Sequence, residues 1–352
     1  VTASTPTVAH FLAEQDPVSC WDALPRKTPV CQIDELLASS WAPDRDAHQP
    51  RLLAPCDLQS IKAAGVTFVS SLLERVVEER AGGDPSAAKR LRTELEQSLG
   101  TSLRTVIPGS PDAARLKDEL QRRGIWSAYL EVGIGPDAEI FTKTEPLAAV
   151  GLGDRIGIRP DSDWNNPEPE LVLVVSPAGQ VIGATLGNDV NLRDFEGRSA
   201  LLLGRAKDNN GSCAIGPFVR LLDDGFTAEA LGRLDITVQV LGEEGFEHSG
   251  SSSTSEMSRS IEELVHQAMG AHHQYPDGMM LFTGTAYAPV EDRIETGGGF
   301  THRPGDIVTI SCVRLGALVN QVAYTDRLPP WTFGVAALLD NLAARGHLGG
   351  DE

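Results

Sequence analysis

The chain has 352 residues, of which 41% are hydrophobic and 22% are charged, as is usual for a soluble globular protein of one or two domains. Its formal net charge of −19 argues against a surface for nucleic acid or anionic membranes, because both need clustered lysine and arginine. No apolar run approaches the roughly 20 residues that a membrane helix needs, and no signal peptide is visible. Five scattered cysteines without a Cys-x-x-Cys pair are typical of reduced thiols, so we expect a cytoplasmic protein.

Residues 1–125 are predicted to form a smaller N-terminal α+β domain. Leu58 to Arg80 carries a long apolar periodicity that Gly82-Gly83 ends. Ser86 is expected to cap a helix over Ala87 to Leu99, stopped by Gly100. Ser110-Pro111 begins a further helix that Gly124 closes, with proline at the first helical position and glycine just past the end.

Residues 126–352 have a different sequence pattern, in which short apolar runs are separated by Gly, Pro and Asp. Several short strands with turn signals predict a β-rich sandwich or barrel. Helices are expected near Ser258 to Met269 and from Trp331 to Arg345. The predicted strands lie at Ile134, Ile156 to Ile158, Leu171 to Val175, Val181 to Leu186, Ile236 to Leu241, Met279 to Thr283, Ile307 to Cys312 and Leu318 to Val322.

Three carboxylates and a lysine stand out in this region: Glu168 and Glu170, then Asp189, then Lys207. Residues two apart on a strand share a face, so the two glutamates can aim at one point. They begin a predicted hairpin, and Asp189 follows its returning strand, so antiparallel pairing brings the three acids together. An all-oxygen cluster favours Mg²⁺, with Mn²⁺ or Ca²⁺ as alternatives. The other interpretation is a solvated acidic rim.

The residues around this cluster resemble the fumarylacetoacetate hydrolase superfamily. Besides the acids and Lys207, the resemblance is carried by Arg193-Asp194 and by Phe282-Thr-Gly-Thr285, and it covers about Leu53 to Arg345. It implies a mixed β-roll or sandwich of the α+β class, a divalent ion held by the three acids, and a homodimer or homotetramer.

Longer matching segments are similar to the branch that holds 2-keto-3-deoxy-D-xylonate and 2-keto-3-deoxy-D-arabinonate dehydratases. The segments begin at Asn165, Gly187, Ala206, His273 and Trp331. The resemblance implies metal-dependent dehydration of a 2-keto-3-deoxypentonate, a small 2-keto sugar acid, to 2-oxoglutarate semialdehyde in non-phosphorylative pentose catabolism.

One departure from the superfamily pattern bears on the reaction. Carbon–carbon hydrolases of the superfamily carry a histidine where this chain has Ser71, three residues before Glu74. A hydrolase needs a base to activate water, so the change favours dehydration over hydrolysis of a 2,4-diketo-3-deoxy sugar acid. That hydrolase and a non-catalytic, metal-stabilised binding protein for keto acids remain the alternatives.

The resemblance also implies roles for individual side chains. Glu139 is the candidate base or acid, because four acids near one divalent ion cannot all be charged cheaply. Lys207 is expected to pair with the substrate carboxylate and stabilise the enolate, and Thr285 to hydrogen-bond that carboxylate. Arg193 is expected to bind substrate or to brace Asp189.

The N-terminal segment contributes two more candidates. If it folds over the site, Glu74 is a further candidate catalytic carboxylate and Ser71 a candidate substrate-binding residue.

Overall fold

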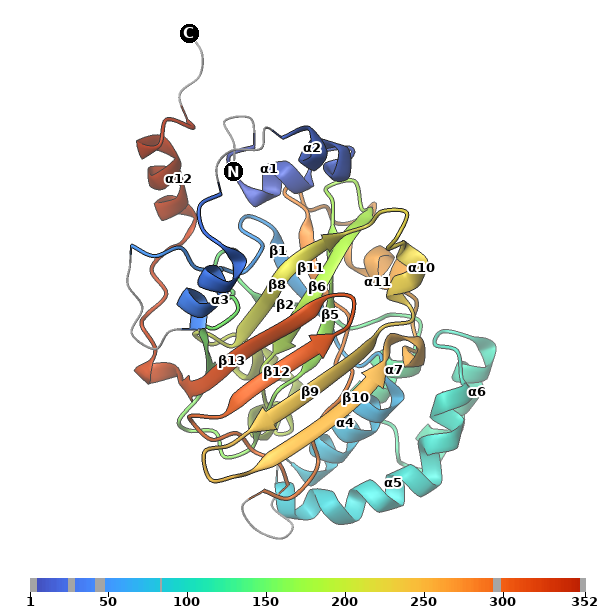
Figure 1. Ribbon diagram of the computed structural model, residues 1–352. Helices are drawn as coiled ribbons and strands as arrows, with labels where there is room; N and C mark the ends of the chain where they lie inside the picture. Colours follow the sequence, from blue (N-terminus) through green and yellow to red (C-terminus); the bar gives the residue numbers. More distant parts are fainter. Residues whose placement is uncertain (1–4, 25–28, 42–47, 83, 294–298, 349–352) are drawn as a thin grey trace.

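Two β-sheets packed face to face form the centre of the molecule (Figure 1). The computed structural model describes residues 5–24, 29–41, 48–82, 84–293 and 299–348. Within these residues a six-stranded sheet has the order β2 (Ile140–Thr144), β1 (Ser60–Ala64), β11 (Met279–Phe282), β5 (Pro169–Val175), β6 (Val181–Asp189) and β8 (Cys213–Leu221). A five-stranded sheet has the order β10 (Glu247–Ser253), β9 (Asp235–Leu241), β12 (Ile307–Cys312), β13 (Gly316–Tyr324) and β3 (Arg155–Ile158). A short ribbon pairs β4 (Asn165–Asn166) with β7 (Asn191–Leu192).

Helices surround the sheets at their ends and outer faces. α4 (Val69–Ala81), α5 (Pro85–Thr105), α6 (Pro111–Arg122) and α7 (Ala128–Ile134) gather at one side, where their apolar faces share one core cluster (Figure 1). The remaining helices are α1 (Val8–Leu12), α2 (Pro17–Ala23), α3 (Ile33–Trp41), α8 (Arg193–Glu196), α9 (Leu203–Lys207), α10 (Ala228–Leu231), α11 (Ile261–Ala268) and α12 (Val335–Ala344). None of the described helices is long and apolar enough to cross a membrane.

Strand β5 shows why the sheet is buried on both faces. Its side chains alternate: Leu171, Leu173 and Val175 join the core between the two sheets, whereas Val172 and Val174 join a second cluster that packs beneath α1. A strand covered on both sides reads as a continuous apolar run, which is what the sequence has here. The expected hairpin is confirmed, because β5 pairs antiparallel with β6.

Several other expected elements are confirmed, and the α+β class with them. The strands over Ile156 to Ile158 and Ile307 to Cys312 are present, and the helix capped by Ser110 runs over α6. The helices predicted within residues 126–352 appear as α11 and α12.

Three predictions near the N-terminal side were wrong in detail. Ile134 ends helix α7 and is not in a strand. The first part of the periodic stretch, residues 60–64, is strand β1, because pairing with β11 and β2 uses its backbone groups. Helix α5 is capped by Asp84 and passes Gly100, because Leu99 and Leu103 bury an apolar face beyond it.

The division of the chain near residue 125 stays a prediction. β1, which precedes that point, pairs in parallel with β11 of the six-stranded sheet. This pairing places the start of α4 beside the loop that follows β11.

Candidate metal and active site

Three carboxylates converge at one end of the β5–β6 hairpin. Glu168, Glu170 and Asp189 each offer an oxygen within 4.8 Å of the others, and all three side chains are buried. The backbone fixes the convergence, because the N–H of Asp189 donates to the carbonyl of Glu168 at 3.0 Å. The Asn188 side chain also accepts from the N–H of Glu168 at 3.0 Å. Burial excludes the solvated acidic rim.

Two cations lie directly against these acids. Lys207, at the end of α9, contacts Glu168 and lies 2.9 Å from Asp189 Oδ2. Arg75, on α4, pairs with the other oxygen of Glu168. Burial opposes ionisation of Glu168, but these two positive charges lower the pKa of its carboxyl to about 2, and Arg75 makes the largest single contribution to that lowering. Glu168 is therefore ionised at every physiological pH.

Glu170 forms no ion pair with the described residues and is held instead by the loop after β11. The backbone N–H of Gly284 donates to Oε2 at 2.7 Å, and Thr285 Oγ1 donates to Oε1 at 3.3 Å. Gly284 has φ +100°, and a Cβ there would collide with Thr67 Oγ1, so glycine is required at this turn. Burial, then the charges of Asp189 and Glu168, raise the pKa of Glu170 well above its ordinary value.

A cavity opens beside the acids, with about 290 Å³ of empty space including the part open to solvent. Glu139, the residue before β2, lies in its wall. Burial and the neighbouring Glu196 raise the pKa of Glu139 to about 7, although Lys207 and Arg75 act in the opposite direction. The residues that line this active-site cavity are Ala64, Gly65, Val66, Arg75, Tyr129, Glu139, Phe141, Glu168, Asp189, Glu196, Lys207 and Thr285.

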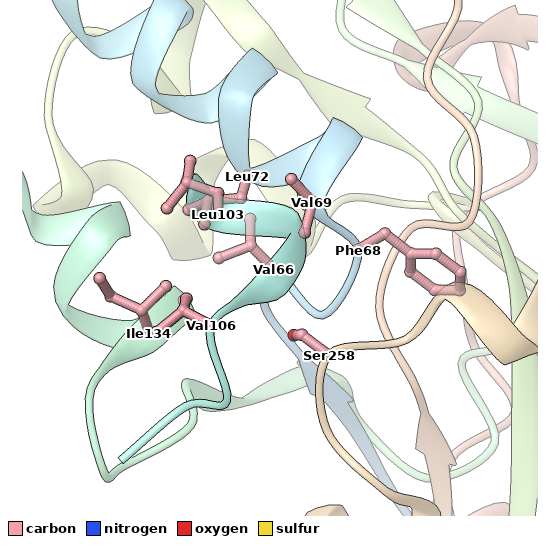
Figure 2. A pocket seen from close by; sticks show the side chains of 9 residues that line it. Val66, Phe68, Val69, Leu72, Leu103, Val106, Ile134 and Ser258 are labelled. Atoms are coloured by element: carbon pink, nitrogen blue, oxygen red, sulfur yellow. The ribbon is translucent and has the colours of Figure 1, made fainter. Parts of the chain in front are cut away.

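A second cavity, with about 210 Å³ of empty space including the part open to solvent, shares Val66 with the wall of the first (Figure 2). Its wall contains no ionisable side chain; apart from Gly133 and Ser258, it is made of apolar side chains such as Leu72, Leu103 and Val106. The Ser258 hydroxyl donates to the carbonyl of Thr67 at 2.9 Å. This second cavity has no group for catalysis, so the chemistry belongs to the active-site cavity.

Three of the predicted site residues lie away from the cavity wall. Arg193 is buried and contacts Glu78 at 3.1 Å and Asn166 at 2.9 Å; no contact with Asp189 is found. The hydroxyl of Ser71 donates to the carbonyl of Thr285 at 2.6 Å, so it supports the loop that holds Glu170. Glu74 is paired with an arginine of α5, at 2.6 Å and 2.8 Å.

Sequence reasoning missed Arg75, Tyr129 and Glu196 in the cavity wall. Arg75 also lies 2.6 Å from Glu78 and 3.1 Å from Glu196, and the Tyr129 hydroxyl lies 3.4 Å from Glu196. Charged residues on an otherwise apolar helix are usually expected to face the solvent. One feature of the sequence could have indicated that Arg75 is buried. It lies between pairs of apolar residues in the middle of a helix, and all sides of that part of the helix are buried.

The set of donors fits a hard divalent cation. The three converging groups are all carboxylates, as Mg²⁺ and Ca²⁺ prefer. Among the described residues that line the cavity or belong to the ion-pair network around its walls, six carboxylates face four cations, which leaves two negative charges when all are ionised. They are Glu78, Glu139, Glu168, Glu170, Asp189 and Glu196 against Arg75, Lys143, Arg193 and Lys207.

The sequence profile of the fumarylacetoacetate (FAA) hydrolase C-terminal family matches residues 129–323, more than half of the chain. The chain belongs to the fumarylacetoacetate hydrolase family. Membership confirms the resemblance read from the motifs around Glu168 and Asp189, and with it the expected fold. The family profile begins after α4, so Arg75 lies outside the matched residues.

Two proteins similar to this chain carry named activities. The 2-dehydro-3-deoxy-D-arabinonate dehydratase of Saccharolobus solfataricus is 37% identical over 184 residues, which is 52% of this chain and 58% of that protein. The probable 2-keto-3-deoxyxylonate dehydratase of Haloferax volcanii is 36% identical over 194 residues, or 55% and 63% of the two chains. The matches thus span less than two thirds of these relatives' length.

Solved structures agree over more of the chain. A 2-keto-3-deoxy-D-arabinonate dehydratase complexed with magnesium and 2,5-dioxopentanoate is 26% identical, with a TM-score of 0.59 over 86% of this chain and 84% of that one. The apo form of a 2-keto-3-deoxy-D-arabinonate dehydratase gives 25% identity and a TM-score of 0.61, over 88% and 90%.

Replacing Glu170 tests whether this residue is a metal ligand or a buried acid with a structural role only. Without metal, Glu170→Gln should be more stable than the wild type near pH 7, because it removes a buried carboxylate that resists ionisation. Magnesium at 100 times its Kd should stabilise the wild type by about 2.7 kcal/mol and the variant far less. Thermal unfolding with and without MgCl₂ measures both. The control is Glu94→Gln, on the exposed side of α5; an equal magnesium response in Glu170→Gln would contradict the metal role.

Proposed function

We propose that the protein dehydrates a 2-keto-3-deoxypentonate, of the D-xylonate or D-arabinonate type, to 2,5-dioxopentanoate (2-oxoglutarate semialdehyde) with Mg²⁺ as cofactor. The observation that carries the proposal is that a single cavity is lined by Glu139, Lys207 and two members of the buried acid triad. The two curated relatives and the magnesium-bound structure, all named as dehydratases, support the reaction type and the ion.

Glu168, Glu170 and Asp189 would hold the ion at the hairpin end. When bound, Mg²⁺ supplies a Lewis acid that polarises the C2 ketone of the substrate and makes the C3 protons more acidic. Lys207 and Thr285, both in the cavity wall, would bind the C1 carboxylate. Burial opposes the charge of Lys207, but Asp189 and Glu168 raise the pKa of its ammonium above the ordinary value, so it is charged in this role.

Glu139 would move the proton. A carboxylate with a pKa near 7 is a stronger base than an ordinary glutamate and is still ionised in part of the population at neutral pH. It would take a C3 proton, and the resulting carboxyl group would then donate a proton to the C4 hydroxyl, which leaves as water. The product of this step is a 5-hydroxy-2-oxopent-3-enoate; loss of a proton from C5 and protonation at C3 give the C4=C5 enol, which tautomerises to the aldehyde.

Ser71 gives the main argument against the hydrolase alternative. Its hydroxyl is committed to the Thr285 carbonyl, and its only described hydrogen bond is to that backbone group, not to a base. A serine in that arrangement does not activate water. The dehydratase is therefore the better-supported reaction, with cleavage of a 2,4-diketo-3-deoxy sugar acid as the alternative outcome of the assay.

The reaction itself is tested with purified protein. With MgCl₂ and 2-keto-3-deoxy-D-xylonate or 2-keto-3-deoxy-D-arabinonate, we expect 2,5-dioxopentanoate, detected by NADP-coupled oxidation of the aldehyde, and we expect EDTA to abolish it. Pyruvate from a 2,4-diketo acid, without dehydration of either pentonate, would replace the lyase by the hydrolase. Ligand-induced stabilisation without turnover of any substrate would support a binding protein instead.

Glu139→Gln should lower kcat by about 10²- to 10⁴-fold while leaving magnesium binding unchanged. The wild-type rate should fall as pH drops, with a midpoint at or below about 7, because the base must be ionised and a bound cation lowers its pKa further. Initial rates from pH 5 to 9 and calorimetric magnesium titrations measure the two effects. A variant that keeps the wild-type rate would exclude Glu139 as the base.

The same residue has a stability signature that does not depend on activity. The pKa of Glu139 in the folded protein lies above its ordinary value, so ionisation destabilises the fold as pH rises from about 4.5 to 7. In EDTA, Glu139→Gln should therefore be more stable than the wild type at pH 8, by on the order of 1–3 kcal/mol, and no more stable at pH 4.

The proposal includes a homodimer or homotetramer, as the family resemblance implies, and a cytoplasmic location, as the scattered cysteines indicate. Exposed apolar side chains around α12 support association of copies, with Trp331 47%, Phe333 46% and Leu339 49% exposed. Light scattering after size exclusion should give a multiple of the 37.6 kDa chain mass. A species of one chain mass at micromolar concentration would exclude the oligomer.

A further inference from the structure

Lys143 is a buried lysine that the proposed reaction does not use. It lies in β2, its side chain has no exposed surface, and it is not among the residues that line the active-site cavity. The register of β2 against β1 shifts at this residue, because Lys62 pairs with Thr142 and Ile61 with Thr144, so Lys143 is the extra residue of a β-bulge. Its side chain is directed into the protein, where its ammonium lies against the metal ligand Asp189.

The ammonium of Lys143 lies 2.9 Å from Asp189 Oδ1, as an ion pair and not as an aligned hydrogen bond. It also donates to the carbonyl of Val190 at 3.3 Å and to the carbonyl of Lys207, which fix its position. The other oxygen of Asp189, Oδ2, lies 2.9 Å from the ammonium of Lys207, which is in the cavity wall. Asp189 therefore directs Oδ2 toward the cavity and Oδ1 toward a buried charge.

Each of the other two acids also has one oxygen held by a fixed group. Glu168 Oε1 is paired with Arg75, which is itself anchored 2.6 Å from Glu78. Glu170 Oε2 accepts from the backbone N–H of Gly284 at 2.7 Å. The second oxygen of each acid faces a group of the cavity wall. Glu168 Oε2 and Asp189 Oδ2 contact the Lys207 ammonium, and Glu170 Oε1 accepts from the Thr285 hydroxyl at 3.3 Å. Each carboxylate thus has one oxygen held by a group behind the site and one oxygen on the cavity side, where a cation would bind.

Three single oxygens suit a small ion. Mg²⁺ takes six ligands in a strict octahedron and keeps several positions for water or substrate, whereas Ca²⁺ takes six to eight and often binds carboxylates through both oxygens. We propose that Lys143 restricts Asp189 to one oxygen toward the cation and so makes the site select Mg²⁺ over Ca²⁺. This inference rests on the metal site of the proposed function but not on its reaction.

Calorimetric titration of metal-free protein with MgCl₂ and with CaCl₂, without substrate, tests the inference. The wild type should bind Mg²⁺ more tightly than Ca²⁺. Lys143→Met removes the charge that holds Oδ1. The ratio of the Kd for Ca²⁺ to the Kd for Mg²⁺ should therefore fall by about tenfold or more. Lys143→Arg, which keeps the charge, should retain the wild-type preference.

Lys62→Met is the matched control, because Lys62 lies on the neighbouring strand β1 and donates to Thr142, away from the acids. Its Kd ratio should equal that of the wild type. If Lys143→Met does not fold, as judged by circular dichroism, Lys143→Gln takes its place with the same expected loss of preference.

Two results would overturn the inference alone: a wild type that binds Ca²⁺ as tightly as Mg²⁺, or a Lys143 variant in which both ions weaken by the same factor. In either case Mg²⁺ still binds and the proposed function stands. Failure of the wild type to bind either ion would overturn the inference together with the metal role in the proposed function.

Discussion

Burial of three carboxylates within 4.8 Å of one another is the constraint on which the rest of the site depends. Charges removed from water are costly unless they are paired and hydrogen-bonded. The protein supplies Arg75, Lys143 and Lys207 to two of the acids, and only a backbone N–H and a hydroxyl to Glu170. The high pKa of Glu170 shows that this compensation is incomplete, which is the condition in which a divalent cation binds well.

The same compensation ties the N-terminal helices to the sheets. Arg75 reaches from α4 to Glu168, and Arg193 reaches from α8 to Glu78 on α4. Ser71, at the start of α4, holds the carbonyl of Thr285 in the loop that binds Glu170. A helix outside the residues matched by the family profile thus supplies one wall of the cavity and supports another.

Local patterns predicted the elements that carry the acids, but not the partners of those acids. The run before Val175 and the turn that follows were enough for the hairpin, because strand length, turn chemistry and alternation are local properties. Ser71 and Glu74 were predicted to line the site, yet Arg75 is the residue of α4 that lines the cavity. Successive residues on a helix point about 100° apart. When all sides of a helix are buried, the sequence alone does not determine which residue faces the cavity.

The sequence by itself determined the hairpin, the convergence of Glu168, Glu170 and Asp189, and the family, because these depend on spacing and alternation within one stretch of chain. The tertiary structure decided which side chains surround the acids. Arg75, Glu196 and Lys143 come from a helix, a second helix and a strand that are far apart in the sequence, and their contacts exist only after these elements pack. Packing also set the pKa of Glu139, because burial and the charge of Glu196 are its main causes.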